Sequence, residues 1–265
     1  MSETSDLPPH TSGAEAGVLE RALSLVRFLR AGCSWDAAQT PVSLTPYLLE
    51  ESIELADALI EGADDETLRS EIGDLLLNLA FQIVLAEERG GFGAGDVLDA
   101  LEDKMRRRHP HLYAGAEERP HWEAEKATER SGGGIFEGLA SLLDPLSRAQ
   151  RVQDRASGVG FDWNDASEAF SKVREEVEEV AAHLGTAERD ELEVEIGDLL
   201  FAVVNVARLA EVHAGTALKL ANVKFERRFA RVAELAQERG LVLGRASLEQ
   251  LDEIWDEVKG GESSQ

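Results

Sequence analysis

The sequence predicts an all-α protein built as a tandem repeat. Apolar residues recur mostly at helical spacing, and only seven prolines interrupt the 265 residues. One segment, EIGDLLLNLAFQIVL at residues 71–85, returns as EIGDLLFAVVNVARL at residues 195–209. Each copy opens with two carboxylates three residues apart and then runs almost wholly apolar, which is typical of a buried helix. Periodicity and repetition together favour two similar helical domains.

Further pairs of residues repeat in the same order along the chain. Their separation shrinks only from 128 to 120 residues, which small changes in loop length explain. A W-x-x-x-K pattern near the end of each copy adds one more pair, so all four tryptophans fall into repeat pairs. This regularity indicates a duplication. The pairs whose separation decreases in this way are Trp35 with Trp163, Glu51 with Glu176, Glu71 with Glu195, and Lys104 with Lys224, and the tryptophans of the W-x-x-x-K patterns are Trp122 and Trp255.

Changes in composition suggest the domain limits. Residues 1–17 are polar with a Pro-Pro pair, and residues 115–138 are largely polar and contain Gly132-Gly133-Gly134, a linker signature. We therefore expect a disordered tail at 1–17, a first domain at 18–114, a linker at 115–138, a second domain at 139–260 and a short tail at 261–265.

Each element of the first domain follows from local signals. A helix is expected over residues 18–30, followed by a loop over 31–46 that contains Trp35. The next helix covers 47–60, and after a turn another begins with Asp64 or Asp65 as its N-cap and continues to about residue 89. A helix over 94–108 ends in a basic run, and Pro110 stops it.

The second domain repeats this order. Helices are expected over residues 139–156, 166–184, 191–213, 216–237 and 247–259, and the sequence GVGFDWN at 158–164 corresponds to the earlier GCSWD loop.

The charge balance and the single cysteine narrow the functional classes. A formal net charge of −25 repels nucleic-acid polymers and anionic membranes, and suits a small or metal-bridged ligand. Cys33 alone excludes an intramolecular disulfide and fits a reducing cytosol. No signal segment and no apolar run of membrane-spanning length occurs, so a cytoplasmic protein without a membrane partner is expected.

Carboxylate pairs occur on two consecutive predicted helices in each copy. Residues three apart share a helix face, and short loops make the two helices antiparallel neighbours, so the pairs can converge. Four clustered carboxylates need divalent cations, and an all-oxygen ligand set favours Mg²⁺, or Mn²⁺, over zinc. The candidate metal ligands are Glu51, Glu54, Glu71 and Asp74 in the first copy, and Glu176, Glu179, Glu195 and Asp198 in the second.

Other interpretations of these residues remain open. A single E-x-x-E is usually a solvated helix face, but a second pair inside an apolar helix, in both copies, disfavours that reading. A di-iron bundle requires Glu-x-x-His on the helices that carry the carboxylates, and none of the four predicted carboxylate helices has a histidine at that spacing after a glutamate, so iron is disfavoured. Asn205 could contact a nucleobase, but a buried amide with its hydrogen bonds made inside the protein is the favoured interpretation.

Basic and aromatic residues late in each copy are candidates for phosphate and base contacts. Phosphate oxygens could be bound by Lys224, Arg227 and Arg228. A basic last turn that stabilises the helix dipole would explain the basic residues of one copy equally well. Trp255 and Lys259 could offer a stacking face beside a cation, or Trp255 could pack in the core. We interpret Trp35 and Trp163 as packing residues.

These motifs together resemble a known family. GCSWDAAQT, EIGDLL, RRRHPHLY, GVGFDW, EIGDLLFAVVN and NVKFERRF resemble the two-domain members of the MazG family of nucleoside triphosphate pyrophosphohydrolases, over residues 18 to 260. The resemblance implies four-helix-bundle-like domains that dimerise. It also implies Mg²⁺-dependent hydrolysis of nucleoside triphosphates to the monophosphate and pyrophosphate.

The resemblance also implies roles for individual residues. The family's catalytic metal quartet falls on Glu176, Glu179, Glu195 and Asp198, and the copies differ around it. Lys172 in the second copy corresponds to Tyr47 in the first, and Asn222 corresponds to Glu102, so the C-terminal domain is the expected main catalytic site. The implied nucleotide contacts are Lys172, Glu175, Asn222, Lys224, Arg227, Arg228, Trp255 and Lys259.

Three functional hypotheses follow. The first is a nucleoside triphosphate pyrophosphohydrolase that clears the nucleotide pool and acts as a homodimer. The second is a helical dimerisation or regulatory module with vestigial metal sites. The third is a narrower activity of the all-α dUTPase or phosphoribosyl-ATP pyrophosphatase type.

Overall fold

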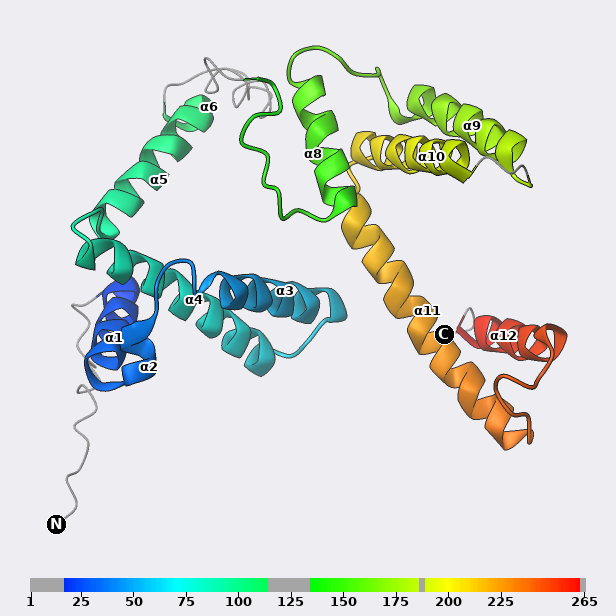
Figure 1. The fold of residues 1–265 in the computed structure, drawn as a ribbon, viewed down its shortest axis with the longest axis horizontal. Helices are drawn as coiled ribbons and strands as arrows, with labels where there is room; N and C mark the ends of the chain where they lie inside the picture. Colours follow the sequence, from blue (N-terminus) through cyan, green and yellow to red (C-terminus); the bar gives the residue numbers. More distant parts are fainter. Residues whose placement is uncertain (1–16, 114–133, 186–188, 263–265) are drawn as a thin grey trace. The chain divides into compact units, whose positions relative to one another are not determined.

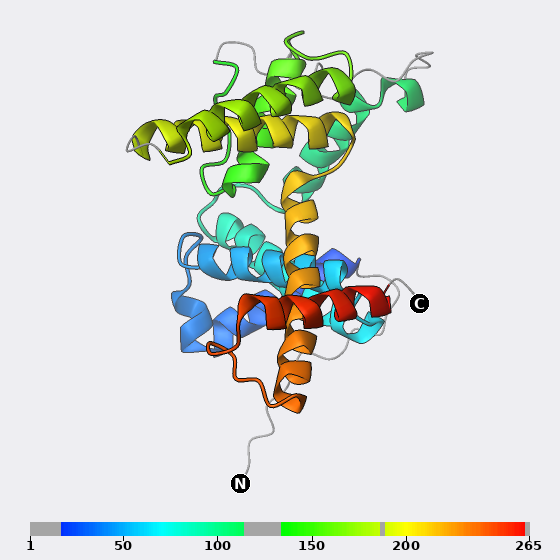
Figure 2. The ribbon, with the colours of Figure 1, turned by 90° about the vertical axis from the view of Figure 1, so that its right-hand side faces the viewer.

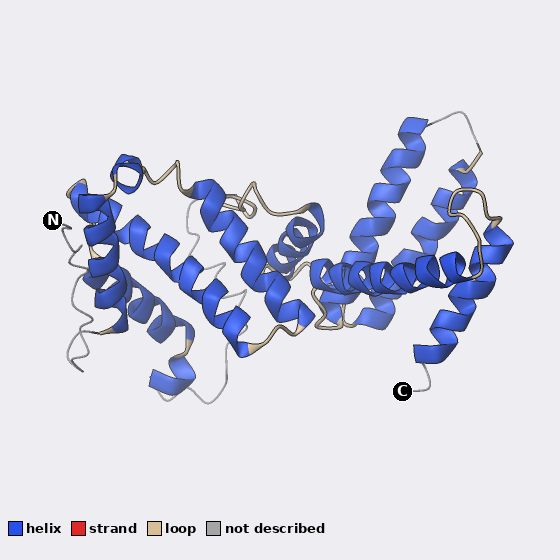
Figure 3. Cartoon of the chain, turned by 90° about the horizontal axis from the view of Figure 1, so that it is seen from below, coloured by secondary structure: helices blue, strands red, loops and turns tan. Residues whose placement is uncertain are grey.

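A computed structural model describes residues 17–113, 134–185 and 189–262. Every regular element in these ranges is a helix (Figures 1 and 3), which confirms the all-α prediction. The chain forms two compact units that divide between Glu117 and Glu118, and each is described here by itself. Among the described residues, no helix combines the length and the apolar character needed to cross a bilayer.

The first unit contains two longer helices at its centre and shorter helices around them. In chain order the elements are α1 (Val18–Gly32), α2 (Ser34–Ala38), α3 (Thr45–Glu61), α4 (Asp65–Glu88), α5 (Ala94–Arg108) and α6 (Pro110–Tyr113).

Helices α3 and α4 form an antiparallel pair (Figure 1), because only a tight turn separates them. Gly62 ends α3 with a φ of 71°, a left-handed conformation that glycine adopts without strain. Asp64 then caps α4, since its side chain accepts a hydrogen bond from the Thr67 N–H at 2.9 Å. This turn sets the two helices side by side.

The core of the first unit lies between α1 and α4. Leu23 and Val26 of α1 are fully buried, and they pack against a cluster on the second half of α4. Burial of this much apolar surface is the main stabilising contribution to such a unit. The α4 members of the cluster are Ala80, Phe81, Ile83, Val84 and Leu85.

The second unit also centres on a pair of neighbouring helices. Its elements are α8 (Pro145–Ser157), α9 (Ala166–His183), α10 (Arg189–Leu209), α11 (Ala214–Glu238) and α12 (Leu248–Glu262).

Helices α9 and α10 lie side by side, and α8 packs across α10 (Figures 1 and 2). The start of α11 contacts α8 and α10, and the rest of α11 runs away from them and carries α12. A small separate core joins these last two helices, built on Val232 and Ala236 of α11 and Ile254 of α12. The second unit therefore has two packing regions, at α8–α10 and at α11–α12.

Most of the predicted helices are confirmed, with three differences. The short helix α2 lies inside the predicted loop 31–46, and a further short helix, α6, begins at Pro110. The helix predicted from residue 139 begins at Pro145, because the Asp144 side chain accepts hydrogen bonds from the N–H groups of Leu146 and Ser147, both at 3.1 Å. That carboxylate and a proline in the first turn are strong helix-start signals.

Only one of the predicted domain limits can be compared with the structure. The division between the two units falls within the predicted linker at residues 115–138. The predicted tail at 1–17, except residue 17, and most of the linker lie outside the described residues, as do the last three residues of the tail at 261–265.

The expectation that both apolar helices are buried is only half right. Seven residues of α4 are buried, whereas in α10 only Ala202 and Val204 are. Leu200 of α10 is 52% exposed and Val203 is 46% exposed. Apolar sequence alone predicts burial, but the neighbours within the described chain cover one side of α10 only.

Candidate active site

Three carboxylates of the second unit converge where α9 and α10 meet. One oxygen from each of Glu176, Glu179 and Glu195 lies within 4.8 Å of the others. Glu176 and Glu179 are one turn apart on α9, and Glu195 faces them from α10. Asp198, the fourth predicted ligand, is outside this group and lines the adjoining cavity.

Glu176 is held by a lysine one turn earlier on α9. The Lys172 ammonium donates to Glu176 Oε1 at 2.6 Å and to Glu175 Oε1 at 2.8 Å. This hydrogen bond holds the pKa of Glu176 below its usual value. The hydrogen bond that Glu179 shares with Glu176, together with burial, raises the pKa of Glu179. Without a cation, the neighbouring carboxylates therefore favour sharing a proton.

The second oxygen of Glu176 lacks a donor. Glu176 is only 4% exposed, and its Oε2 receives no hydrogen bond from an N–H or hydroxyl group of the described residues. A buried carboxylate oxygen left in this state costs about 1–3 kcal/mol or more. A cation bound between α9 and α10 would remove that cost.

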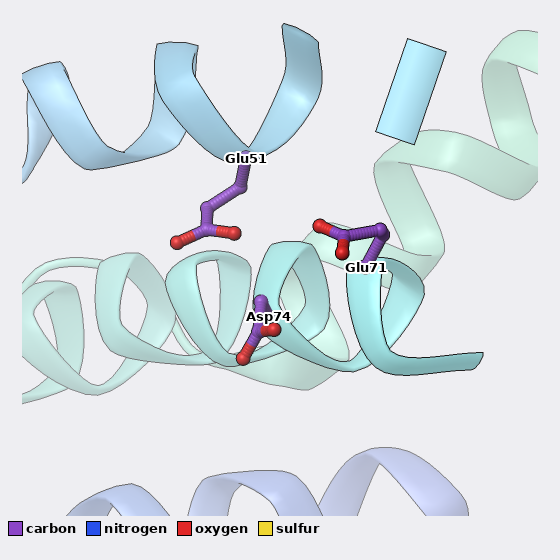
Figure 4. A group of neighbouring side chains, drawn as sticks. All are labelled: Glu51, Glu71 and Asp74. Atoms are coloured by element: carbon purple, nitrogen blue, oxygen red, sulfur yellow. The ribbon is translucent and has the colours of Figure 1, made fainter. Parts of the chain in front are cut away.

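The first unit has a matching cluster between α3 and α4. Glu51 extends from α3 toward α4, where Glu71 and Asp74 lie, and the three offer oxygens within 4.8 Å of one another (Figure 4). Glu54, predicted as the fourth ligand, is outside this group. Burial first, and then the charge of Asp74 and other carboxylates, raises the pKa of Glu51.

Both clusters suit a hard divalent cation. Each combines carboxylates from two helices, and neither contains a histidine or cysteine ligand. Oxygen-only ligand sets of this kind are preferred by small hard ions rather than by zinc. The pKa of Glu51 is raised, and one oxygen of Glu176 has no hydrogen-bond donor among the described residues. Both observations indicate negative charge that the described residues do not fully neutralise.

A cavity of about 800 Å³ opens beside the second cluster. It is lined by residues of α8, the loop 158–164, α9 and α10 together with Phe136, and Lys172, Glu176 and Asp198 are its polar residues next to the carboxylate cluster. The rest of the lining is mostly apolar, with aromatic rings from Phe161, Trp163, Phe136 and Phe201. Apolar walls with a few polar groups are typical of small-molecule sites.

The predicted nucleotide contacts fall into two places. Lys172 and Glu175 lie at the carboxylate cluster. The others lie on α11 and α12, which Figures 1 and 2 show extending away from α9 and α10. The structure therefore does not bring all of them together within one unit. The distant group is Asn222, Lys224, Arg227 and Arg228 on α11 with Trp255 and Lys259 on α12.

The distant group has contacts of its own. Arg227 and Arg228 pair with Glu262 at the end of α12, at 2.9 and 2.7 Å. The Trp255 ring lies 5.2 Å from the Phe225 ring, centroid to centroid, and packs against the small core of α11 and α12. These contacts tie α12 to α11.

Sequence reasoning missed several residues of the cavity. Gln153 of α8, Asp162 and Arg208 line it without having been predicted, and Trp163, interpreted as a packing residue, lines it and is 44% exposed. The GVGFDW loop was recognisable as a repeated motif. A buried glutamine on an amphipathic helix gives no comparable signal, because its role depends on the helix that packs against it.

Comparisons with known proteins agree with this geometry. The family model of the MazG nucleotide pyrophosphohydrolase domain matches residues 39–113 and again residues 166–233. Each match contains one complete carboxylate quartet. The two matches confirm the tandem repeat.

Individual relatives resemble nearly the whole chain. A Thermotoga maritima protein named nucleoside triphosphate pyrophosphohydrolase/pyrophosphatase MazG is 41% identical over 258 residues, covering 94% of this chain and 99% of that protein. The nucleoside triphosphate pyrophosphohydrolase of Escherichia coli K12 is 40% identical over 255 residues, covering 91% and 97%. The uncharacterized protein YabN of Bacillus subtilis is 38% identical over 247 residues, but these form only 50% of that longer protein. With its domain matched twice and its similarity extending end to end, the chain belongs to the MazG family.

Proposed function

We propose that this protein hydrolyses nucleoside and deoxynucleoside triphosphates to the monophosphate and pyrophosphate, with the second unit as the main catalytic site. The observation that carries the proposal is the position of Lys172, Glu176 and Asp198 on one cavity large enough for a nucleotide. The names of the T. maritima and E. coli relatives support the same reaction.

The expected cofactor is Mg²⁺, with Mn²⁺ as a substitute. Glu176, Glu179, Glu195 and Asp198 would hold it in the second unit, and Glu51, Glu54, Glu71 and Asp74 in the first. When bound, a divalent ion polarises phosphoryl oxygens and neutralises part of the triphosphate charge.

The side chains of the second unit supply binding and positioning. The Lys172 ammonium, which pairs with Glu175 and Glu176, would exchange a carboxylate oxygen for a phosphate oxygen of the substrate. The quartet carboxylates are the candidate acceptors for the proton of the attacking water. The mostly apolar wall of the cavity would leave less water around a bound triphosphate, which would strengthen these charge interactions.

The protein is proposed to act as a homodimer. The exposed apolar side chains of α9 and α10 support this, among them Val177 at 50%, Leu200 at 52% and Val203 at 46%. Contiguous exposed apolar surface is typical of an interface. For the α11–α12 group to have the predicted role in nucleotide binding, a dimer would have to bring this group of one copy to the carboxylates of the other. Light scattering after gel filtration tests the assembly, and a monomer at micromolar concentration would contradict it.

The reaction is tested by phosphate release from ATP, GTP, dATP and dCTP. With Mg²⁺ present, phosphate should appear only after inorganic pyrophosphatase is added, because pyrophosphate is the expected product, and EDTA should abolish it. Phosphate released without pyrophosphatase would point instead to cleavage of the terminal phosphate. No turnover of any triphosphate would contradict the proposal and favour the dimerisation module.

A panel that includes dUTP and phosphoribosyl-ATP separates broad from narrow specificity. Similar rates for several bases would fit clearance of the nucleotide pool in the cytoplasm, the role that we expect. A single strongly preferred substrate would favour the narrower alternative.

A further inference from the structure

We propose that the part of the cavity beside Gln153 and Asn205 in the second unit is a nucleobase subsite, in which Gln153 accepts a hydrogen bond from an N–H donor on the base. This inference rests on the proposed function, because it assigns the part of the nucleotide that lies beyond the triphosphate. Neither the family match nor the names of the relatives assign these residues a role.

The orientation of the Gln153 amide is fixed, so that its oxygen is a hydrogen-bond acceptor on the cavity wall. Its Nε2 donates to the Phe201 carbonyl of α10 at 2.8 Å, so the amide cannot be turned without losing that bond. Gln153 is only 6% exposed, and its Oε1 is buried with no hydrogen-bond partner among the described residues. Because buried acceptors are nearly always paired in folded proteins, an unpaired one on a cavity wall marks the place of a ligand donor.

Asn205 supplies a complementary donor on the same wall. Arg208 donates to Asn205 Oδ1 through Nε at 3.1 Å and through Nη2 at 2.8 Å. Arg208 is itself fixed by Asp162 of the loop 158–164, with Nη1 at 3.0 Å from Oδ2. With its oxygen occupied, Asn205 offers its NH₂ group to the cavity that it lines.

The rest of the wall suits an aromatic ring. Phe136, Phe161, Trp163 and Phe201 line the cavity, and flat aromatic faces stack on any base. Every common nucleobase carries an N–H donor next to an acceptor on its pairing edge. A paired acceptor and donor on the protein therefore fits a base of either class, in keeping with broad substrate use.

A phosphate group does not fit beside Gln153. Phosphate oxygens are acceptors, so they would face the Gln153 oxygen without a proton to share. The cation nearest the amides, Arg208, is already paired with Asp162. The triphosphate therefore belongs at the other part of the same cavity, where Lys172, Glu176 and Asp198 lie.

The test compares ATP with purine riboside triphosphate, which lacks only the exocyclic amino group of adenine. All variants carry Glu71→Gln and Asp74→Asn, so that turnover reports the second unit. The otherwise unchanged second unit should prefer ATP by about three- to tenfold in kcat/KM, the value of one neutral hydrogen bond. In Gln153→Met the ratio should fall toward one.

Gln150→Met is the matched control. Gln150 lies one turn earlier on α8, accepts a hydrogen bond from the Ala214 N–H at 3.2 Å, and is not part of the cavity wall. The control loses a comparable contact between elements and should keep the preference for ATP. Two outcomes would contradict the proposed subsite. One is an equal kcat/KM for ATP and purine riboside triphosphate in the protein that keeps Gln153, and the other is an unchanged ratio of the two values in Gln153→Met.

A second pair of variants tests the subsite in case Gln153→Met does not fold. Trp163→Ala should raise KM for every triphosphate about fivefold or more by loss of stacking, whereas Trp35→Ala in the first unit should not. Equal KM values in the two variants would overturn the subsite. Failure of the parent protein to hydrolyse any triphosphate would instead remove the proposed function, and the subsite with it.

Discussion

The two units carry the same carboxylate quartet but differ in the surroundings of its first glutamate, Glu51 or Glu176. In the second unit Lys172 donates to Glu176 and lowers its pKa. In the first unit the position of that lysine is Tyr47, whose ring packs edge-on against Trp35 at 5.9 Å, and the pKa of Glu51 is raised. Glu176 therefore has a cationic partner on its own helix, whereas Glu51, at the corresponding position, is surrounded by further carboxylates.

The space beside the quartet also differs. Aligning the repeats on Glu71 and Glu195 places Asn205 and Arg208 opposite Phe81 and Val84. The two cavity residues are thus replaced by side chains that are 4% and 1% exposed in the core of the first unit. One unit uses this position to bury apolar surface, and the other keeps it polar beside a cavity. This difference beside identical ligand types is one reason to place the proposed catalytic site in the second unit.

Removing ligands from each quartet is the strongest test of this comparison. Glu195→Gln with Asp198→Asn should lower kcat/KM for ATP by about 100-fold or more, because a bound cation contributes several kcal/mol to such reactions. Glu71→Gln with Asp74→Asn, the matched control, should remove a smaller part. The coupled pyrophosphatase assay measures both, and equal losses would break the ranking of the two units.

Exchanging the lysine position sharpens the comparison. Lys172→Tyr copies the first unit into the second and should lower kcat/KM about tenfold, because a charged hydrogen bond to the substrate is lost. Most of the change should appear in KM, and Lys172→Arg should retain part of the activity. Tyr47→Lys should not create a comparable gain, since Phe81 and Val84 still fill the neighbouring space. An unchanged rate in Lys172→Tyr would show that the lysine does not distinguish the units.

The smallest effect concerns stability without a cation. In EDTA at neutral pH, Glu51→Gln should raise Tm by about 1–3 °C, because it removes a carboxylate whose raised pKa makes the charged form unfavourable. Glu176→Gln should lower Tm, because the lowered pKa shows that the charged form is stabilised by Lys172. Calorimetry measures both variants. Shifts of the same sign would contradict the assignment of opposite charge environments.

Sequence reasoning was most successful where the signals are local. The repeated E-x-x-E and E-x-x-D patterns placed carboxylates on shared helix faces. The turn at Gly62–Asp65 was predicted with Asp64 or Asp65 as the N-cap of the next helix, and the structure shows that Asp64 is the cap. The helix start at Pro145 was missed, although Asp144 and Pro145 are themselves local signals.

The sequence by itself determined that the protein is helical, is duplicated and has two carboxylate quartets. Each of these properties follows from the spacing of residues within short segments and from the repetition of those segments. Only the tertiary structure decided which three carboxylates of each quartet converge and which of the repeated helices is buried. It alone paired Gln153 with the Phe201 carbonyl, 48 residues away. Helical periodicity fixes the face on which a side chain lies, but the partner of that face depends on how distant helices pack.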